Sequence, residues 1–166
     1  MSARAIIALP STLTERTTAA DLLAVEDAAY DTLVSDTPLG DEAAAAIWEA
    51  CQRTGTRDPL ITRILQTHPS LRTRALDRLS AILTRLDTPD PEMLTLAGTL
   101  TWATEGDPRH ARLLLALAVE TGTRYALAHL VSEAISTGLP PETWLTVTEH
   151  LTLDDMRTNP SAPNVA

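Results

Sequence analysis

The sequence predicts an all-α fold, an array of antiparallel helical hairpins with repeat-like packing and seven or eight helices. Three observations support this prediction. Apolar blocks rich in Leu and Ala follow one another through residues 88–144, each long enough for about four helical turns. Helix start and stop signals separate these blocks, so the connections between the predicted helices are only a few residues long. No stretch shows the convincing alternation of apolar and polar residues that predicts a strand.

Asp-Pro and Gly mark the ends of the blocks. Asp-Pro at 90–91 and at 107–108 places a carboxylate where it can accept from the free amides of a first turn, and a proline where no amide is needed. Gly106, Gly122 and Gly138 follow the blocks and can adopt the left-handed conformation that ends a helix. Such short connections are typical of antiparallel neighbours.

For the N-terminal part of the chain, the sequence predicts an irregular lead followed by an acidic first helix. Residues 1–16 show no periodicity. A helix is predicted from near Thr18, because Asp21 follows three residues later and an apolar face begins there. That face comprises Leu22, Val25, Ala29 and Leu33.

A second helix is predicted from Asp41 through Trp48 to Thr54, closed by Gly55. The four alanines at 43–46 favour a helix and add little bulk, so a neighbouring helix could approach them closely.

The middle of the chain predicts a short helix and a strongly amphipathic one. Asp-Pro at 58–59 is predicted to start the short helix, which ends before His-Pro at 68–69. The amphipathic helix is predicted over residues 70–86, where apolar residues recur at helical spacing. The members of that apolar stripe are Leu71, Ala75, Leu76, Leu79, Ile82, Leu83 and Leu86.

Three helices are then predicted over residues 91–105, 108–121 and 124–137, and another from Pro140. The domain organisation that follows is a lead over 1–16, a single helical domain over 17–157 and a disordered tail over 158–166. Within the domain, residues 17–55 form acidic N-terminal helices and residues 57–150 form the hairpin array.

One spacing resembles that of tetratricopeptide hairpins. Ala111, Leu115 and Ala118 place small, large and small residues as the second helix of such a hairpin does. Gly98 lies in the preceding helix, where a small residue lets the pair close. This single match predicts repeat-like packing without membership of that family.

The composition excludes several functions. All 13 basic residues are Arg, so Schiff-base chemistry and a P-loop lysine are excluded. Together with abundant Ala, Leu, Thr and Pro, this usage indicates a GC-rich, actinobacterial source. Cys51 is the single cysteine, which excludes an intrachain disulfide, and the apolar run at 5–9 is too short for a signal peptide or a membrane span. We therefore expect a cytoplasmic protein that does not bind membranes.

The formal net charge of −9 conceals a basic middle. Residues 1–52 carry two Arg and nine acidic residues, a sum of −7. Residues 53–86 carry seven Arg and two acidic residues, a sum of +5. Residues 87–166 carry four Arg and eleven acidic residues, again −7.

The arginines of that middle are the main candidate binding residues: Arg72, Arg74, Arg78 and Arg85, together with Arg63. Guanidinium forks suit phosphate oxygens, so one interpretation is a nucleic-acid surface. The acidic chain disfavours it, because repulsion weakens the encounter with a polyanion. The other interpretations are pairing with the neighbouring acidic helices, or contact with an acidic partner or a second subunit.

The tryptophans also have two interpretations. Trp102 is predicted to lie in the core of its hairpin. Trp48 and Trp144 lie nearer the ends of the array, where an exposed Trp could anchor a partner, although a core position is favoured for both.

No pattern predicts a metal, a cofactor or a catalytic residue. The four histidines, His68, His110, His129 and His150, match no zinc spacing, although His129 and Glu133 share a helical face. Cys51 could be activated by nearby arginines, but a free Cys on a helix face is usually a small apolar residue. The acidic pairs at 26–27 and 154–155 are predicted to lie on solvated faces.

A longer set of motifs resembles the C-terminal helical part of the actinobacterial family catalogued as domain of unknown function 4192. The motifs are the Thr-Trp-Ala at 101–103, the Gly-Asp turn at 106–107, the Leu/Ala helix at 111–118, the Tyr-Ala-Leu-Ala at 125–128 and the Pro-Pro at 140–141. Arg-Asp at 57–58 and the helices after it also resemble that family's middle section. The resemblance covers roughly residues 57–145 and leaves out residues 1–55. It implies a helical domain without an assigned biochemical role and carries over no catalytic residue.

The leading functional hypothesis is a non-enzymatic module for protein–protein interaction or scaffolding, with a protein partner or self-association that buries Trp144 or the alanines at 43–46. The first alternative is a nucleic-acid-binding or regulatory protein that uses the arginines of residues 63–85. The second alternative is an enzyme whose active residues the sequence does not reveal.

Overall fold

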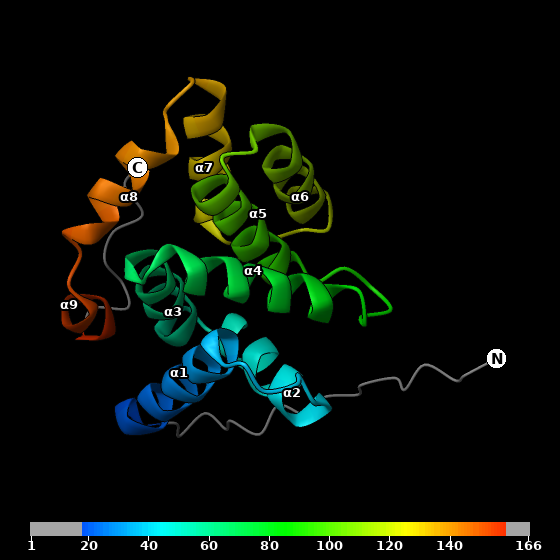
Figure 1. Ribbon diagram of the computed structural model, residues 1–166, viewed down its shortest axis with the longest axis vertical. Helices are drawn as coiled ribbons and strands as arrows, with labels where there is room; N and C mark the ends of the chain where they lie inside the picture. Colours follow the sequence, from blue (N-terminus) through cyan, green and yellow to red (C-terminus); the bar gives the residue numbers. More distant parts are fainter. Residues whose placement is uncertain (1–17, 159–166) are drawn as a thin grey trace.

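The computed structural model describes residues 18–158, and within them it is all-α, with no strand, as predicted (Figure 1). The predicted lead over 1–16 and all but the first residue of the predicted tail over 158–166 lie outside the described residues. The nine helices described are α1 (Ala19–Val34), α2 (Asp41–Cys51), α3 (Thr54–Gln66), α4 (Pro69–Leu83), α5 (Pro91–Glu105), α6 (Pro108–Glu120), α7 (Ala126–Ser136), α8 (Pro141–Glu149) and α9 (Leu153–Thr158).

The helices form two groups with α4 between them. Figure 1 shows α1, α2 and α3 below α4, and α5, α6 and α7 above it. Both α1 and α5 pack against α4, which joins the two groups. Helices α8 and α9 descend along one side, so that the chain returns from α7 to pack α9 against α3. None of the helices between residues 18 and 158 is long and apolar enough to cross a membrane.

The predicted caps at the starts of α1 and α6 are confirmed, whereas the start predicted at Asp58 is wrong because α3 begins at Thr54. Thr18 and Asp21 form a capping box at the start of α1, and these hydrogen bonds from Thr18 lower the pKa of Asp21. Asp107 accepts from the backbone amides of Arg109 and His110 at 2.9 and 3.1 Å at the start of α6. These hydrogen bonds stabilise the charged carboxylate and so lower the pKa of Asp107, and the bond from the His110 amide contributes most.

The three glycines predicted to end helices all adopt a positive φ. Gly106, Gly122 and Gly138 have φ angles of 64°, 94° and 75°. Residues with a side chain rarely adopt this conformation, so glycine suits these positions.

The predicted boundary between the second and third helices is wrong. Helix α2 ends at Cys51, and α3 already begins at Thr54, so Gly55 lies in its first turn rather than after α2. The hydroxyl of Thr56 donates to the carbonyl of Ala50 at 2.6 Å, which fixes the short connection. Pro59 consequently lies inside α3, near its N-terminal end, where it removes one backbone hydrogen bond.

Helix α9 was not predicted, although a local signal for it exists. The hydroxyl of Thr152 accepts from the amide of Asp155 at 3.3 Å and also contacts its carboxylate. This is a capping pattern over three residues. Helix α9 ends at Thr158, which is the first residue of the expected tail.

Helix α5 is the central helix of the fold. Every residue from Met93 to Ala103 is buried, and the hydroxyls of Thr95, Thr99 and Thr101 donate to carbonyls one turn back at 2.8 to 2.9 Å. These threonines therefore satisfy their own hydroxyls, and α5 can be surrounded by other helices without unpaired hydroxyls at these three positions.

Among the described helices, α5 and α6 share the most extensive contact, and Gly98 lets them approach closely. A Cβ atom at Gly98 would lie 2.9 Å from Cγ of Leu115, closer than real Cβ atoms lie to their neighbours. Ala111, Leu115 and Ala118 are fully buried on the facing side of α6. The structure thus confirms the close approach inferred from this spacing.

We expect Gly98→Val to lower the free energy of unfolding by about 1–3 kcal/mol, because the added methyl groups overpack the α5–α6 contact. Urea denaturation followed by circular dichroism measures the change. The matched control is Ala24→Val on the exposed side of α1, where only helix propensity changes, by about 0.5 kcal/mol. Equal effects at the two positions would contradict the close packing.

Candidate functional site

The arginines of α4 lie against the segment that joins α1 to α2. Arg74 donates to the carbonyl of Val34 at 2.8 Å and pairs with the carboxylate of Asp36 at 2.6 Å. Arg78 donates to the carbonyl of Thr37. These guanidinium groups therefore hold the α1–α2 connection onto α4.

Arg85 continues this row beyond the end of α4. Both of its terminal nitrogens donate to the carbonyl of Leu39 at 3.2 Å, and one lies 3.7 Å from the carboxylate of Asp41. Arg72 donates instead to the carbonyl of Leu65 at 3.4 Å. All four arginines predicted to bind a partner thus have partners within the chain. Whether they also bind another molecule stays a prediction.

Arg63 belongs to a different cluster. It pairs with Asp27 at 2.6 Å, and its guanidinium carbon lies 3.8 Å from the centre of the Tyr30 ring. The five candidate arginines therefore do not form one continuous surface.

The two candidate tryptophans also make contacts within the chain. The indole nitrogen of Trp48 donates to Asp90 at 3.0 Å. The ring centres of Trp144 and Trp102 lie 5.9 Å apart, and Trp102 is buried as predicted. Of the four alanines at 43–46, Ala44 is buried and the others are half-buried. A partner role for these positions stays a prediction.

The histidines and Cys51 do not form a metal site in the described part of the chain. Between residues 18 and 158, no three His, Cys, Asp or Glu side chains lie close enough to hold a metal ion. His68 accepts from the amide of Ser70 and so caps α4. Cys51 is completely buried, and burial, with a smaller contribution from Asp90, raises the pKa of its thiol far above the usual value. The reactive thiolate is therefore strongly disfavoured.

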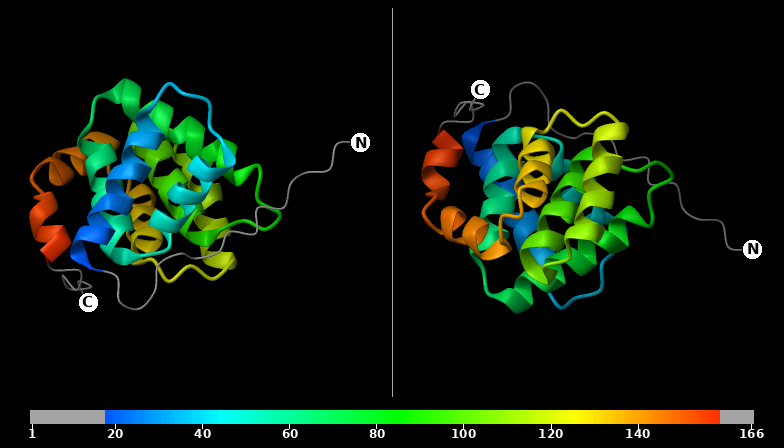
Figure 2. Two further views of the ribbon diagram at one scale, coloured as in Figure 1. Left: turned by 90° about the horizontal axis from the view of Figure 1, so that it is seen from below. Right: turned by 90° about the horizontal axis from the view of Figure 1, so that it is seen from above.

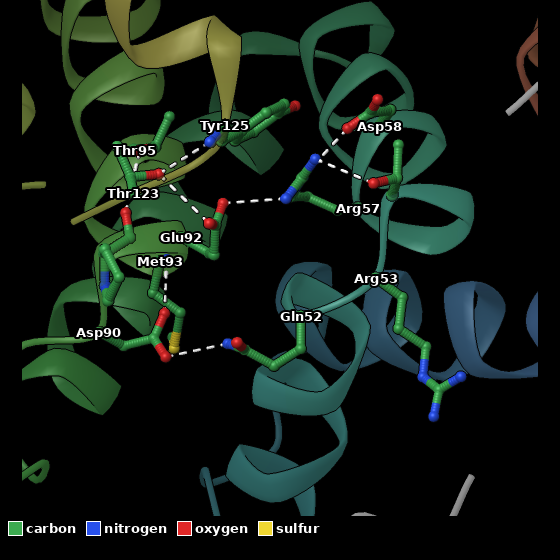
Figure 3. A network of polar contacts seen from close by, with 12 residues as sticks. Gln52, Arg53, Arg57, Asp58, Asp90, Glu92, Met93, Thr95, Thr123 and Tyr125 are labelled. Carbon is green, nitrogen blue, oxygen red and sulfur yellow. Dashed lines mark hydrogen bonds and ion pairs between the residues drawn. The ribbon is translucent and has the colours of Figure 1, made fainter. Parts of the chain in front are cut away.

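A network of polar contacts surrounds the buried Arg57, as Figure 3 shows. The side chain of Arg57 is 10% exposed and pairs with Asp58 at 3.0 Å and with Glu92 at 2.9 Å. Its guanidinium carbon lies 3.5 Å from the centre of the Tyr125 ring. Burial, followed by the charge of Asp58, raises the pKa of Tyr125.

Two carboxylates at the start of α5 complete this network (Figure 3). Asp90 caps α5 through the amide of Met93 and accepts from Gln52 at 2.9 Å, as well as from Trp48. Glu92 accepts from the hydroxyl of Thr123 at 3.2 Å. The network joins α2, α3, α5 and the α6–α7 connection. Since Arg57 pairs with Asp58 and Glu92, and Asp90 accepts from neutral donors, the network acts as a structural clamp.

The solvated position predicted for Glu26 is wrong. The sequence predicts a solvated pair at 26–27, but Glu26 is only 1% exposed. Arg157 of α9 donates to its two carboxylate oxygens at 2.8 and 2.6 Å, and Arg63 lies 3.8 Å away. The prediction failed because the neutralising arginine is 131 residues away in the sequence.

A pocket of about 330 Å³ lies beside this pair, where α1, α3 and α9 meet. Its apolar wall comes from α1, including Leu22 and Leu23. Its charged groups are Glu26, Arg157 and Asp154, and ion pairs already join Arg157 to both carboxylates. The pocket therefore offers little to orient a reacting molecule.

The outer face of α6 carries exposed leucines. Leu113 is 71% exposed and Leu117 is 36% exposed, and the two are one turn apart. At about 100° per residue, each lies about 160° around the helix from the buried Leu115, so both project away from the core. Figure 2 shows α6 at the edge of the molecule, and its main neighbours are α5 and α7. We call Leu113 and Leu117 the α6 ridge.

Comparison with known proteins identifies one family. The family model described as Domain of unknown function (DUF4192) matches residues 3–142. The match thus includes the N-terminal helices, so the expectation that residues 1–55 lie outside the resemblance was wrong. No curated protein and no solved structure matches the chain.

We expect Cys51 to be inert in the folded protein because its thiol is buried and its pKa is raised. At pH 8, labelling by a disulfide reagent should be at least ~100-fold slower than in the urea-unfolded chain, since it requires opening of the core. Rapid stoichiometric labelling of the native protein would contradict this and would revive a nucleophilic role.

We expect Arg57→Lys to lower the free energy of unfolding by about 1–3 kcal/mol, because a lysine lacks the fork that reaches Asp58 and Glu92 while stacking on Tyr125. Thermal and urea unfolding measure the loss. The control is Arg124→Lys, an exposed position that should leave stability unchanged within about 0.5 kcal/mol.

Proposed function

The chain belongs to the family DUF4192, a domain of unknown function, and we propose that it is a non-enzymatic module for protein–protein interaction or scaffolding. The observation that carries this proposal is the α6 ridge. Leu113 keeps most of its surface in water, and Leu117 extends the apolar surface by one turn. Exposure of two large apolar residues on one outward face is costly in water and favours a contact that covers them.

The chemistry of the described residues supports a binding role over a catalytic one. Catalysis by general acid and base needs titratable groups that meet beside a space for substrate. Here the buried Glu26 and the half-buried Glu92 are each neutralised by an arginine, and the single thiol is enclosed. These pairings stabilise the helical array and neutralise both carboxylates, which supports a binding role.

The contacts of the α4 arginines also favour a protein partner over a nucleic acid. Phosphate recognition needs guanidinium groups that are free to turn toward the ligand. Arg74, Arg78 and Arg85 instead donate to carbonyls of the α1–α2 connection. Binding to DNA or RNA would have to break these bonds and overcome a formal net charge of −9.

Photo-crosslinking from the α6 ridge tests the interaction. A benzophenone amino acid that replaces Leu113 should form a protein adduct in living cells, because the side chain at this position meets the partner. The same amino acid in place of Val147, which is 57% exposed on α8, is the matched control. Absence of an adduct at 113, or equal adduct formation at both positions, would overturn the proposed function.

A further inference from the structure

We infer that the partner of the α6 ridge is a second copy of this chain, packed antiparallel on the first across a two-fold axis. This inference rests on the proposed interaction function and names its partner. The argument depends on the order of residues along the outer face of α6, because a two-fold contact requires a surface that is complementary to itself.

The apolar part of α6 is self-complementary. An antiparallel two-fold axis at the level of Leu115 places Leu113 beside Leu117 of the second copy, and Leu117 beside Leu113 of the second copy. Both leucines are exposed and lie on either side of the centre of the outward face. Each would fill the space next to the other, as side chains of packed helices do.

The charged part of α6 is self-complementary in the same arrangement. Arg109 and Glu120 lie at opposite ends of α6, yet only about 20° apart around the helix. A two-fold axis perpendicular to both helices keeps them on the same side of the contact and reverses their order. Each Arg109 then lies within one residue of the level of Glu120 of the second copy, at both ends of the ridge.

These two side chains are available for such a pair. Arg109 and Glu120 are both exposed, and neither has an ion-pair partner among residues 18–158. The local charge also permits the contact. Helix α6 carries two arginines and one glutamate, a sum of +1, whereas the whole chain carries −9. Two copies can therefore meet here without the repulsion expected between their acidic surfaces.

The size of the contact sets the expected affinity. One helix face against another buries less than the roughly 800 Å² per partner of a standard stable interface. We therefore expect a reversible dimer with a dissociation constant on the order of 10 to 100 μM.

Analytical ultracentrifugation of the full chain from about 5 to 500 μM tests this inference in that concentration range. The wild-type protein should change from monomer to dimer with increasing concentration. Leu113→Glu should raise the dissociation constant at least ~100-fold, because it places like charges beside an apolar surface. Val147→Glu, which adds the same charge to α8, should leave the dimer unchanged.

A charge exchange then tests the antiparallel arrangement. Glu120→Arg alone and Arg109→Glu alone should each weaken the dimer about 3–10-fold, since each places like charges opposite one another. The double variant with both substitutions should restore the wild-type constant. Circular dichroism checks that all variants remain folded.

The outcomes separate this inference from the proposed function. A wild-type monomer at ~500 μM, or a dimer insensitive to Leu113→Glu, would overturn the self-association. A crosslinked adduct from position 113 with the mass of two chains would support both proposals. An adduct with a different protein would retain the interaction function and overturn the dimer.

Discussion

The first turn of α5 is the point on which the rest of the structure depends. Two carboxylates, Asp90 and Glu92, collect donors there from α2, α3 and the α6–α7 connection. Asp90 also accepts from an amide of its own helix, so the group that starts α5 is also the group that holds α2. Buried charge of this kind is tolerated only when it is fully paired, and the pairing fixes how the helices sit relative to one another.

This anchoring lets α5 be buried on all sides. The helices around α5 each turn one face toward it and leave another face exposed to solvent. With α5 enclosed, α6 covers it with a narrow face of Ala111, Leu115 and Ala118 and leaves its opposite face to water. Leu113 on that opposite face is 71% exposed and adds little to the packing of the monomer, and Leu117 beside it is 36% exposed. The same geometry that makes the core compact thus leaves an apolar surface at the edge of the array.

The parts of the fold that depend on local chemistry could be predicted from the sequence, and the parts that depend on distant contacts could not. The Asp caps, the glycines with positive φ and the close approach at Gly98 follow from the properties of single residues and short spacings. Gly55 misled the prediction because glycine ends a helix only where φ becomes positive, which does not occur there. The burial of Glu26 depends on Arg157, and the arrangement around Arg57 depends on Glu92. The spacing of Ala111, Leu115 and Ala118 indicated which face of α6 meets α5, but it did not show whether another helix covers the leucines of the opposite face.

The contact between Glu26 and Arg157 has a consequence for the order of events during synthesis. A ribosome adds about 5 to 20 residues per second, so roughly 7 to 26 s separate the two residues. Throughout that interval the carboxylate of Glu26 lacks its principal cation, and burying it would be costly. The N-terminal helix therefore has reason to remain hydrated and loosely attached while the central helices assemble. It can dock fully only once Arg157 has left the ribosome.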